Sequence, residues 1–368
     1  MKIKKTIGYF FIFFGILNFI LGFFGILMNE HSLLIKINIS ILFLLFGTWL
    51  ANKKWLPILI PLIIGIGIIY YQFTTLTSEE IAKIKVSFQK ANYNYILLTL
   101  VIACIGYWSR AYRWKFALNH LGYQTKFHNN FFTVCVSYLV NLTVPRSGEI
   151  SRAALLKKYE DVPFDKAFGT IVAERIVDFA IFLFFVFIGF ISQYNTIHQF
   201  LIDKKVPIAS IVYAGIIALV MLIVFILIWI YAEWKIIKKL KKKLSGLIEG
   251  MTTIYKMKDR WNYLFHSFFI WFSYLLMFYV AKFALPETFD IGFDIIIMGF
   301  VFGSLAIGFS NGGLGAFPFS IALIFSLYGI SNNVGTAFGW LVWTSQTILT
   351  LLLGLISYVL LPNLNRNK

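Results

Sequence analysis

The chain has 368 residues and a mean hydropathy of +0.79; 59% of its residues are hydrophobic and 13% are charged. This composition excludes a soluble fold, and several apolar runs are long enough to cross a bilayer as helices. The runs are continuous rather than alternating, so helices are expected and a barrel is not. The formal net charge is +17, from 33 Lys and Arg against 16 Asp and Glu.

The positive charge fits a membrane topology better than a nucleic-acid-binding surface. The lysines lie in short loops beside the apolar runs, which is the pattern of loops kept in the cytoplasm. We therefore expect a multi-pass protein of the cytoplasmic (inner) membrane with both termini in the cytoplasm and no nucleic-acid partner. Cys104 and Cys135 lie in apolar segments and the five histidines are scattered, so no disulfide, metal site or cofactor is predicted.

Apolar runs at 6–28 and 33–50 predict a helix pair that forms an extra N-terminal unit, residues 1–54. The first run follows MKIKK, but it is too long for a secretion signal and lacks a cleavage site, so we expect a retained span. A third span is predicted at 56–73. A short helix capped near Ser78 should follow it outside the membrane.

The fourth predicted span, 93–116, ends in the sequence WSRAYRWK. Its aromatic and basic residues predict a belt that anchors the helix at the inner surface of the membrane. The alternative is a gate in which the arginines face lipid headgroups. The residues concerned are Trp108, Arg110, Arg113, Trp114 and Lys115.

Two further apolar runs are too short for a full span. The run at 131–144 ends at a proline, and the run at 295–309 ends in SNGGLGAFPF. Because irregular backbone at membrane depth needs a protein-lined cavity, we predict a re-entrant hairpin at 129–159 from the cytoplasmic side. A second hairpin at 295–328 should enter from the opposite side. The opposed entry suggests an inverted repeat whose hairpins meet near the bilayer midplane, a transporter-like arrangement.

The remaining spans are predicted at 167–191, 208–231, 263–285 and 337–360. The basic segment at 235–243 is either an interfacial amphipathic helix or a solvated topology signal. The predicted fold class is therefore an all-α polytopic membrane protein. It has about eight or nine transmembrane helices and two re-entrant hairpins, with an inverted repeat as its candidate symmetry.

One stretch concentrates ionisable residues within this apolar chain. Such groups are costly at membrane depth unless they are paired or face a polar cavity. Glu149 and Arg152 would share one face of a helix beginning near residue 147, with Arg146 at its N-terminus. Gly148 would allow close approach of a ligand or a neighbouring backbone. The ionisable groups of the stretch are Arg146, Glu149, Arg152, Glu174, Arg175 and Asp178.

Two interpretations of this stretch are open, and they are compatible. In the first, Arg146 or Arg152 pairs with an acid of the following span and fixes the hairpin to it. In the second, the arginines bind a lipid phosphate in a cavity, and the carboxylates orient them or take up a proton. Guanidinium groups match phosphate with two parallel hydrogen bonds, and a helix N-terminus suits an anion.

The glycine-rich segment at 310–318 is not a nucleotide-binding loop, because it lacks the following Lys-Ser/Thr and the preceding strand. Its small residues favour either close helix packing with a bent backbone or a substrate site lined by backbone. The candidate residues are Asn311, Gly312, Gly313 and Gly315.

The sequence PRSGEISRAALLKKYEDVPFDKAFGTIVAERIVD resembles the transmembrane region of lysylphosphatidylglycerol synthases and of their stand-alone flippase-like relatives. The shared pattern is P-x-x-x-G-E-x-x-R followed by E-R-x-x-D, and WSRAYRWKFALNHLGY and GGLGAF also match. The resemblance covers about 55–361 and implies a flippase-like domain over 55–368. The resemblance also implies which residues occupy the motif positions of the family. They are Arg146, Gly148, Glu149, Arg152, Glu174, Arg175, Asp178, Gly312, Gly313 and Gly315.

The chain also departs from the family pattern. Asn311 stands where the family commonly has proline, and Pro318 stands where many members have an acidic or polar residue. An acid that took part in transport in relatives would be absent here or moved. The aminoacyltransferase domain of full-length synthases does not fit before Lys368, so lipid aminoacylation by this chain alone is not expected.

The resulting expectation is a flippase-like transporter, not an enzyme. It would move an anionic, phosphate-bearing lipid, either a phospholipid or a polyprenyl-phosphate-linked one, across the cytoplasmic membrane. Arg146, Arg152 and Arg175 would bind the headgroup, and the carboxylates would position it or couple to protons. Membrane lipids are the expected partners, together with a second copy or a separate synthase. The alternatives are a membrane transferase for lipid-linked glycans or aminoacyl-lipids, and a scaffold subunit.

Overall fold

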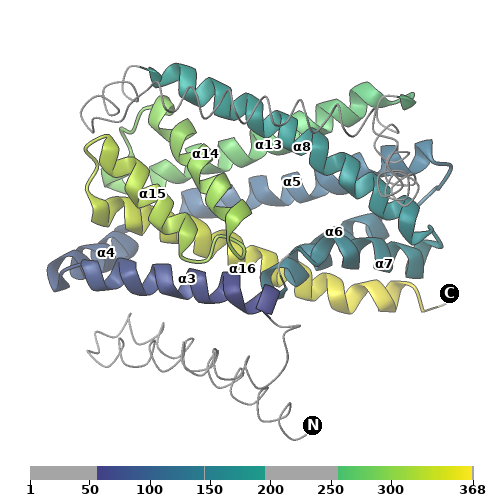
Figure 1. Ribbon diagram of the computed structural model, residues 1–368, viewed down its shortest axis with the longest axis horizontal. Coiled ribbons are helices and arrows are strands. Elements are labelled where there is room, and N and C mark those ends of the chain that lie inside the picture. The colour runs from purple at the N-terminus through teal and green to yellow at the C-terminus, as the bar shows by residue number, and fades with distance from the viewer. Residues whose placement is uncertain (1–55, 145, 195–255, 367–368) are drawn as a thin grey trace, which may run out of the picture.

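The computed structural model describes residues 56–144, 146–194 and 256–366, and all regular structure in these ranges is helical (Figure 1). The predicted N-terminal pair, the span at 208–231 and the basic segment at 235–243 lie outside the described residues, so the division at residue 54 stays a prediction. The predicted all-α polytopic fold is confirmed. The first helices are α3 (Leu56–Thr75), α4 (Ser78–Lys90), α5 (Tyr93–His120), α6 (Phe127–Thr143), α7 (Gly148–Glu160) and α8 (Phe164–Ser192).

The second half of the described chain contains the remaining helices. They are α13 (Arg260–Ala281), the 3₁₀ turns η2 (Lys282–Ala284) and η3 (Pro286–Thr288), α14 (Phe293–Phe309), α15 (Ala316–Leu327) and α16 (Asn332–Leu364).

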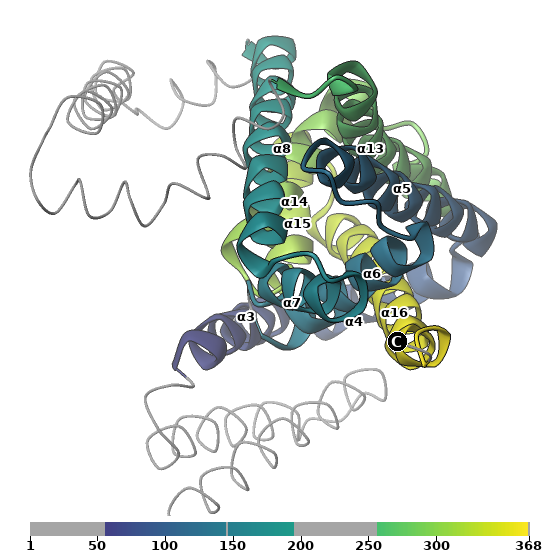
Figure 2. The same cartoon turned by 90° about the vertical axis from the view of Figure 1, so that its right-hand side faces the viewer.

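Three of the described helices are long and apolar enough to cross a membrane: α5, α13 with its 3₁₀ extension, and α16. They have 28, 25 and 33 residues, so each exceeds the roughly 20 residues that span a bilayer core. Figures 1 and 2 show α5 and α13 side by side. Helix α8 has 29 residues, and its charged residues all lie in its first half. The fold is therefore that of a membrane-embedded, multi-pass protein.

Four shorter helices form the two predicted hairpins, α6–α7 and α14–α15. These helices have 17, 13, 17 and 12 residues, so each is shorter than the roughly 30 Å hydrocarbon core at a 1.5 Å rise per residue. The hairpins come from opposite ends of the molecule, and their turns meet near the middle of its long axis (Figure 1). Asn311 Nδ2 donates a hydrogen bond to the Leu142 carbonyl at 3.2 Å, which joins the two turns.

Helix α16 packs along both hairpins through glycines. A Cβ atom at Gly339 would lie 2.6 Å from Cα of Pro318 in α15, and one at Gly354 would lie 2.5 Å from Cβ of Leu139 in α6. Such distances require that no side chain be present, so these glycines set the close approach of the helices. At the end of α16, Asn365 Nδ2 donates to Asn129 Oδ1 of α6 at 2.8 Å.

The glycine-rich turn between α14 and α15 has the bent backbone and the close helix packing that its small residues predict. Gly312, Gly313 and Gly315 have φ of +60°, +83° and +68°, the left-handed region that glycine enters without strain. A Cβ at Gly315 would lie 2.6 Å from the carbonyl of Gly65 in α3. The Trp343 indole also donates to the Gly312 carbonyl at 2.7 Å. The turn is therefore bent and closely packed at the same time.

The predicted short helix is confirmed as α4, and its cap is Thr77, next to the predicted position. The Glu80 amide donates to Thr77 Oγ1 at 3.2 Å, and the Thr77 amide donates to Glu80 Oε2 at 2.8 Å. This reciprocal pair is a capping box, in which a Glu three residues after the cap returns its hydrogen bond. The backbone and side-chain hydrogen bonds from Thr77 lower the pKa of Glu80.

Candidate functional site

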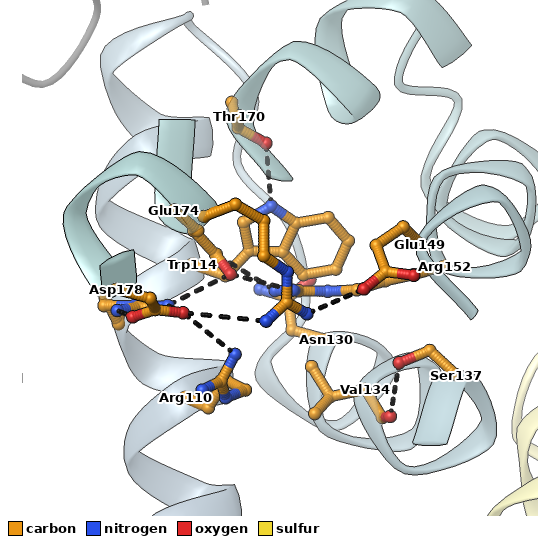
Figure 3. Close-up of polar contacts among 12 residues, drawn as sticks. Arg110, Trp114, Asn130, Val134, Ser137, Glu149, Arg152, Thr170, Glu174 and Asp178 are labelled. Carbon is orange, nitrogen blue, oxygen red and sulfur yellow. Dashed lines mark hydrogen bonds and ion pairs between the residues drawn. The ribbon is translucent and has the colours of Figure 1, made fainter. Parts of the chain in front are cut away.

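Helices α5, α7 and α8 bring together five buried ionisable side chains, which we call the buried charge cluster (Figure 3). Their side-chain exposed fractions lie between 0 and 6%. The apolar core of these helices, including Leu118, Leu156 and Ile171, packs beside them. The members of the cluster are Arg110, Arg113, Arg152, Glu174 and Asp178.

Arg152 anchors α7 to α8. Its Nη1 and Nη2 donate to Glu174 Oε2 and Oε1 at 2.9 and 3.1 Å, which gives a two-bond ion pair. Its guanidinium carbon lies 3.7 Å from the ring centre of Trp114. The Trp114 indole donates to Thr170 Oγ1 of α8 at 2.8 Å. The expected pairing of the hairpin with the following helix is therefore present, and α5 takes part in it.

Arg113 bridges the two acids of α8. Its Nη1 donates to Asp178 Oδ1 at 2.6 Å and to Ser267 Oγ at 3.0 Å. Its Nη2 donates to Glu174 Oε2 at 3.2 Å and to Asp178 Oδ2 at 3.3 Å. The Tyr263 ring centre lies 5.4 Å from its guanidinium carbon. Arg113 thus joins α5, α8 and α13 through four hydrogen bonds.

The interpretation of Arg110, Arg113 and Trp114 as a surface belt is wrong. Their exposed fractions are 3, 0 and 0%, whereas Trp108 is 46% exposed. Residues 110, 113, 114 and 117 share one face of α5, and this face points into the protein. Two features of the sequence could have predicted that these residues are buried. Small residues, Ala103 and Gly106, precede them on the same face of α5, and two acids in the apolar helix α8 need cationic partners.

A more accessible ion pair lies beside the cluster, and we call its members, Glu149 and Arg175, the rim. Arg175 Nη2 lies 2.9 Å from Glu149 Oε1, and Arg175 Nη1 lies 3.8 Å from Asp178 Oδ2. The side chains of Arg175 and Glu149 are 45 and 23% exposed. Arg146 is exposed, has φ of +60°, and makes no ion pair within the described residues. The expected pairing therefore involves Arg152 and not Arg146.

The start of α7 is capped from α6. The Ser147 side chain makes no capping hydrogen bond to the helix. Instead, the Gly148 amide donates to Asn141 Oδ1 at 2.7 Å. A Cβ at Gly148 would overlap the Ser137 carbonyl and the Asn141 side chain. Gly148 therefore acts in close packing of the hairpin rather than as an opening for a ligand.

The candidate residues of the glycine-rich segment, Asn311, Gly312, Gly313 and Gly315, lie in the turn between α14 and α15. Among the described residues, no hydrogen bond or ion pair joins Asn311 or the three glycines to the buried charge cluster. Asn311 is 7% exposed, and its Oδ1 has no hydrogen-bond partner in the described part of the chain. The structure thus brings together the charged candidates other than Arg146, and it places the glycine segment against α3, α16 and the tip of α6.

The buried charge cluster has an excess of positive charge. Three guanidinium groups face two carboxylates, and an arginine keeps its charge in protein interiors. An uncompensated buried charge is costly unless a counter-ion reaches it. The Glu149–Arg175 pair of the rim is neutral and does not remove the excess. The arrangement can therefore accept an anion, and no group of side chains in the described ranges could hold a metal ion.

The family model described as the lysylphosphatidylglycerol synthase TM region matches residues 58–354. A UPF0104 membrane protein of Methanocaldococcus jannaschii is 36% identical over 110 residues, which is 29% of this chain and only 32% of the relative. A UPF0104 membrane protein of Methanothermobacter thermautotrophicus is 25% identical over 278 residues, or 69% of this chain and 82% of the relative. No solved structure matches the chain.

Proposed function

This chain belongs to the lysylphosphatidylglycerol synthase transmembrane-region family, and from that premise we propose that it moves an anionic, phosphate-bearing lipid across the cytoplasmic membrane. The family membership supports a role connected with membrane lipids. The observation that carries the transport proposal is the excess positive charge buried between α5, α7 and α8. A phosphate group would compensate it, whereas a neutral or zwitterionic headgroup would do so less well.

The rim supplies the entry for the headgroup. Arg175 is the half-exposed arginine of the site, and it contacts both Glu149 in the rim and Asp178 in the cluster. The Glu149–Arg175 pair is partly exposed, at 23 and 45%, so a phosphate can displace Glu149 at a lower cost than it could a carboxylate of the buried cluster. Arg146 lies exposed before α7 and adds a further positive charge. The phosphate would then be bound by Arg175 and face the uncompensated cluster.

The hairpins would let the headgroup cross while the acyl chains stay in lipid. The α6–α7 and α14–α15 turns contact one another at Leu142 and Asn311. Broken helices that meet at mid-depth are a recurrent way to build transport sites. In this proposal both termini are cytoplasmic, and the lipid is a phospholipid or a polyprenyl-phosphate-linked one.

The experiment is lipid transfer in proteoliposomes by the full chain, with fluorescent phosphatidylglycerol and phosphatidylcholine compared with and without a proton gradient. Wild type should transfer phosphatidylglycerol faster than protein-free vesicles, and faster than it transfers phosphatidylcholine. Arg175→Gln should slow phosphatidylglycerol transfer roughly tenfold, the loss expected for one charged hydrogen bond. Lys157→Gln, an exposed charge change at the far end of α7, is the matched control and should transfer as wild type.

The result that would overturn the transport proposal is wild-type transfer no faster than protein-free vesicles for either lipid, with and without the gradient. Equal transfer of the two lipids would remove the role of the charge excess. If Lys157→Gln slowed transfer as much as Arg175→Gln, the effect would be one of general surface charge and not of the rim.

A further inference from the structure

Arg110 makes the longest hydrogen bond of the three arginines in the buried charge cluster. A guanidinium group has five N–H donors. Arg110 makes two long hydrogen bonds, one from Nη1 to Asp178 Oδ2 at 3.4 Å and one from Nη2 to the Tyr274 hydroxyl at 3.3 Å. Its Nε, like the Nε atoms of Arg113 and Arg152, has no partner among the described residues, and Arg110 is only 3% exposed. Arg113, one turn further along α5, makes four hydrogen bonds, and the shortest of them is 2.6 Å long.

Two tyrosines contact Arg110, and a third packs against one of them. Tyr274 of α13 accepts its hydrogen bond, and the ring centre of Tyr138 in α6 lies 5.7 Å from its guanidinium carbon. The ring of Tyr107 in α5 lies 4.9 Å from that of Tyr138. All three tyrosines keep accessible surface, unlike the buried arginine between them. We call Arg110, Tyr107, Tyr138 and Tyr274 the tyrosine chamber.

We infer that the tyrosine chamber is an anion subsite, deeper than the rim, that binds a phosphodiester oxygen of the transported lipid. The inference rests on the proposed function and adds residues that the charged motifs do not include. Phosphate oxygens accept hydrogen bonds from guanidinium N–H groups, with which they form strong charge-assisted contacts. The phenol hydroxyls of Tyr138 and Tyr274 can donate to the same oxygens. Binding there would complete the coordination of Arg110.

Polar groups continue from the chamber along the seam between α5 and α16. The hydroxyls of Tyr107 and Thr350 are 2.9 Å apart, and Gln346 Nε2 lies 3.4 Å from Thr99 Oγ1. Thr99 precedes Arg110 by about three turns of α5, or about 16 Å of helix. This distance is roughly half of a bilayer core. In this inference the chamber lies between the charged residues and these hydroxyl and amide groups of the seam between α5 and α16.

The test measures binding by the full chain in detergent, with short-chain phosphatidylglycerol as the probe and titration calorimetry as the readout. Tyr274→Phe and Tyr138→Phe each remove one hydroxyl and keep the ring. Each should weaken binding roughly three- to tenfold, the loss of one hydrogen bond to a charged group. Tyr263→Phe is the matched control: its ring stacks on Arg113, and its buried hydroxyl has no partner in the described part of the chain. It should bind as wild type.

Failure of this inference and failure of the proposed function give different results. If wild type transfers phosphatidylglycerol in vesicles while both chamber variants bind and transfer as wild type, the chamber is overturned and transport stands. If wild type binds but never transfers, and the chamber variants bind more weakly, transport is overturned and the chamber stands. Equal affinity for glycerol phosphate would overturn the assignment to a lipid, because the chamber would then accept a free phosphate ester. A loss in Tyr263→Phe as large as in Tyr274→Phe would also overturn it.

Discussion

Arg152 and Glu174 form a two-bond ion pair, 2.9 and 3.1 Å long, between side chains that are 3 and 0% exposed. Removing Glu174 would leave three buried arginines facing Asp178 alone. Glu174→Ala should therefore lower the free energy of unfolding by about 3–5 kcal/mol. Thermal unfolding in detergent measures this loss. Arg175→Gln, which breaks the partly exposed pair of the rim, should cost about 1 kcal/mol, and an equal loss in the two variants would contradict the distinction between cluster and rim.

Gly148 should not tolerate even one added methyl group. The Cβ of alanine would overlap the Ser137 carbonyl and the Asn141 side chain, which caps α7. Because Ser137 contributes backbone, the hairpin must separate, and we expect Gly148→Ala to cost about 1–3 kcal/mol or more. Gly67→Ala is the control, since nothing lies within 4 Å of a Cβ at that position in α3; it should be neutral or stabilising by up to about 1 kcal/mol. The two midpoints of thermal unfolding decide the prediction, and equal midpoints would refute it.

The capping box of α4 gives a local, pH-dependent prediction. Thr77→Ala removes the acceptor for the Glu80 amide and should destabilise the first turn of α4 by about 1 kcal/mol. Hydrogen exchange of the α4 amides should rise accordingly, whereas Ser78→Ala should leave it unchanged. The pKa of folded Glu80 is lowered by its bonds to Thr77. The contribution of the box is therefore present above the ordinary pKa of glutamate and is lost as pH falls through the lowered value. Protection of α4 that did not change across this acidic range would contradict the prediction.

Much of the architecture could be predicted because its signals are local. The short apolar runs, the proline after 144 and the glycines at 312, 313 and 315 mark the two hairpins directly. The acids Glu174 and Asp178 within an apolar helix indicate a buried ion-pair site. Spacing within one helix also places Glu149 and Arg152 near each other. Each of these features depends on the residues within a few turns of the chain.

The parts that could not be predicted depend on helices far apart in sequence. Arg110 and Arg113 stand at the end of a span, where basic residues usually anchor a helix at the interface. Only the packing of α5 against α8 shows that they supply the counter-charges of Asp178. Arg146 was expected in the cluster, but it lies exposed just before α7, with φ of +60°. The structural need for Gly148 likewise appears only when α6 lies against α7.

The most direct measurement of the central claim compares Glu149→Gln with Arg175→Gln in their affinity for short-chain phosphatidylglycerol. These two residues form one ion pair at 2.9 Å, so a purely structural pair would be broken equally by either change. If Arg175 binds the phosphate and Glu149 competes for it, Glu149→Gln should strengthen binding severalfold and Arg175→Gln should weaken it roughly tenfold. Changes of the same sign and size in the two variants would contradict the account.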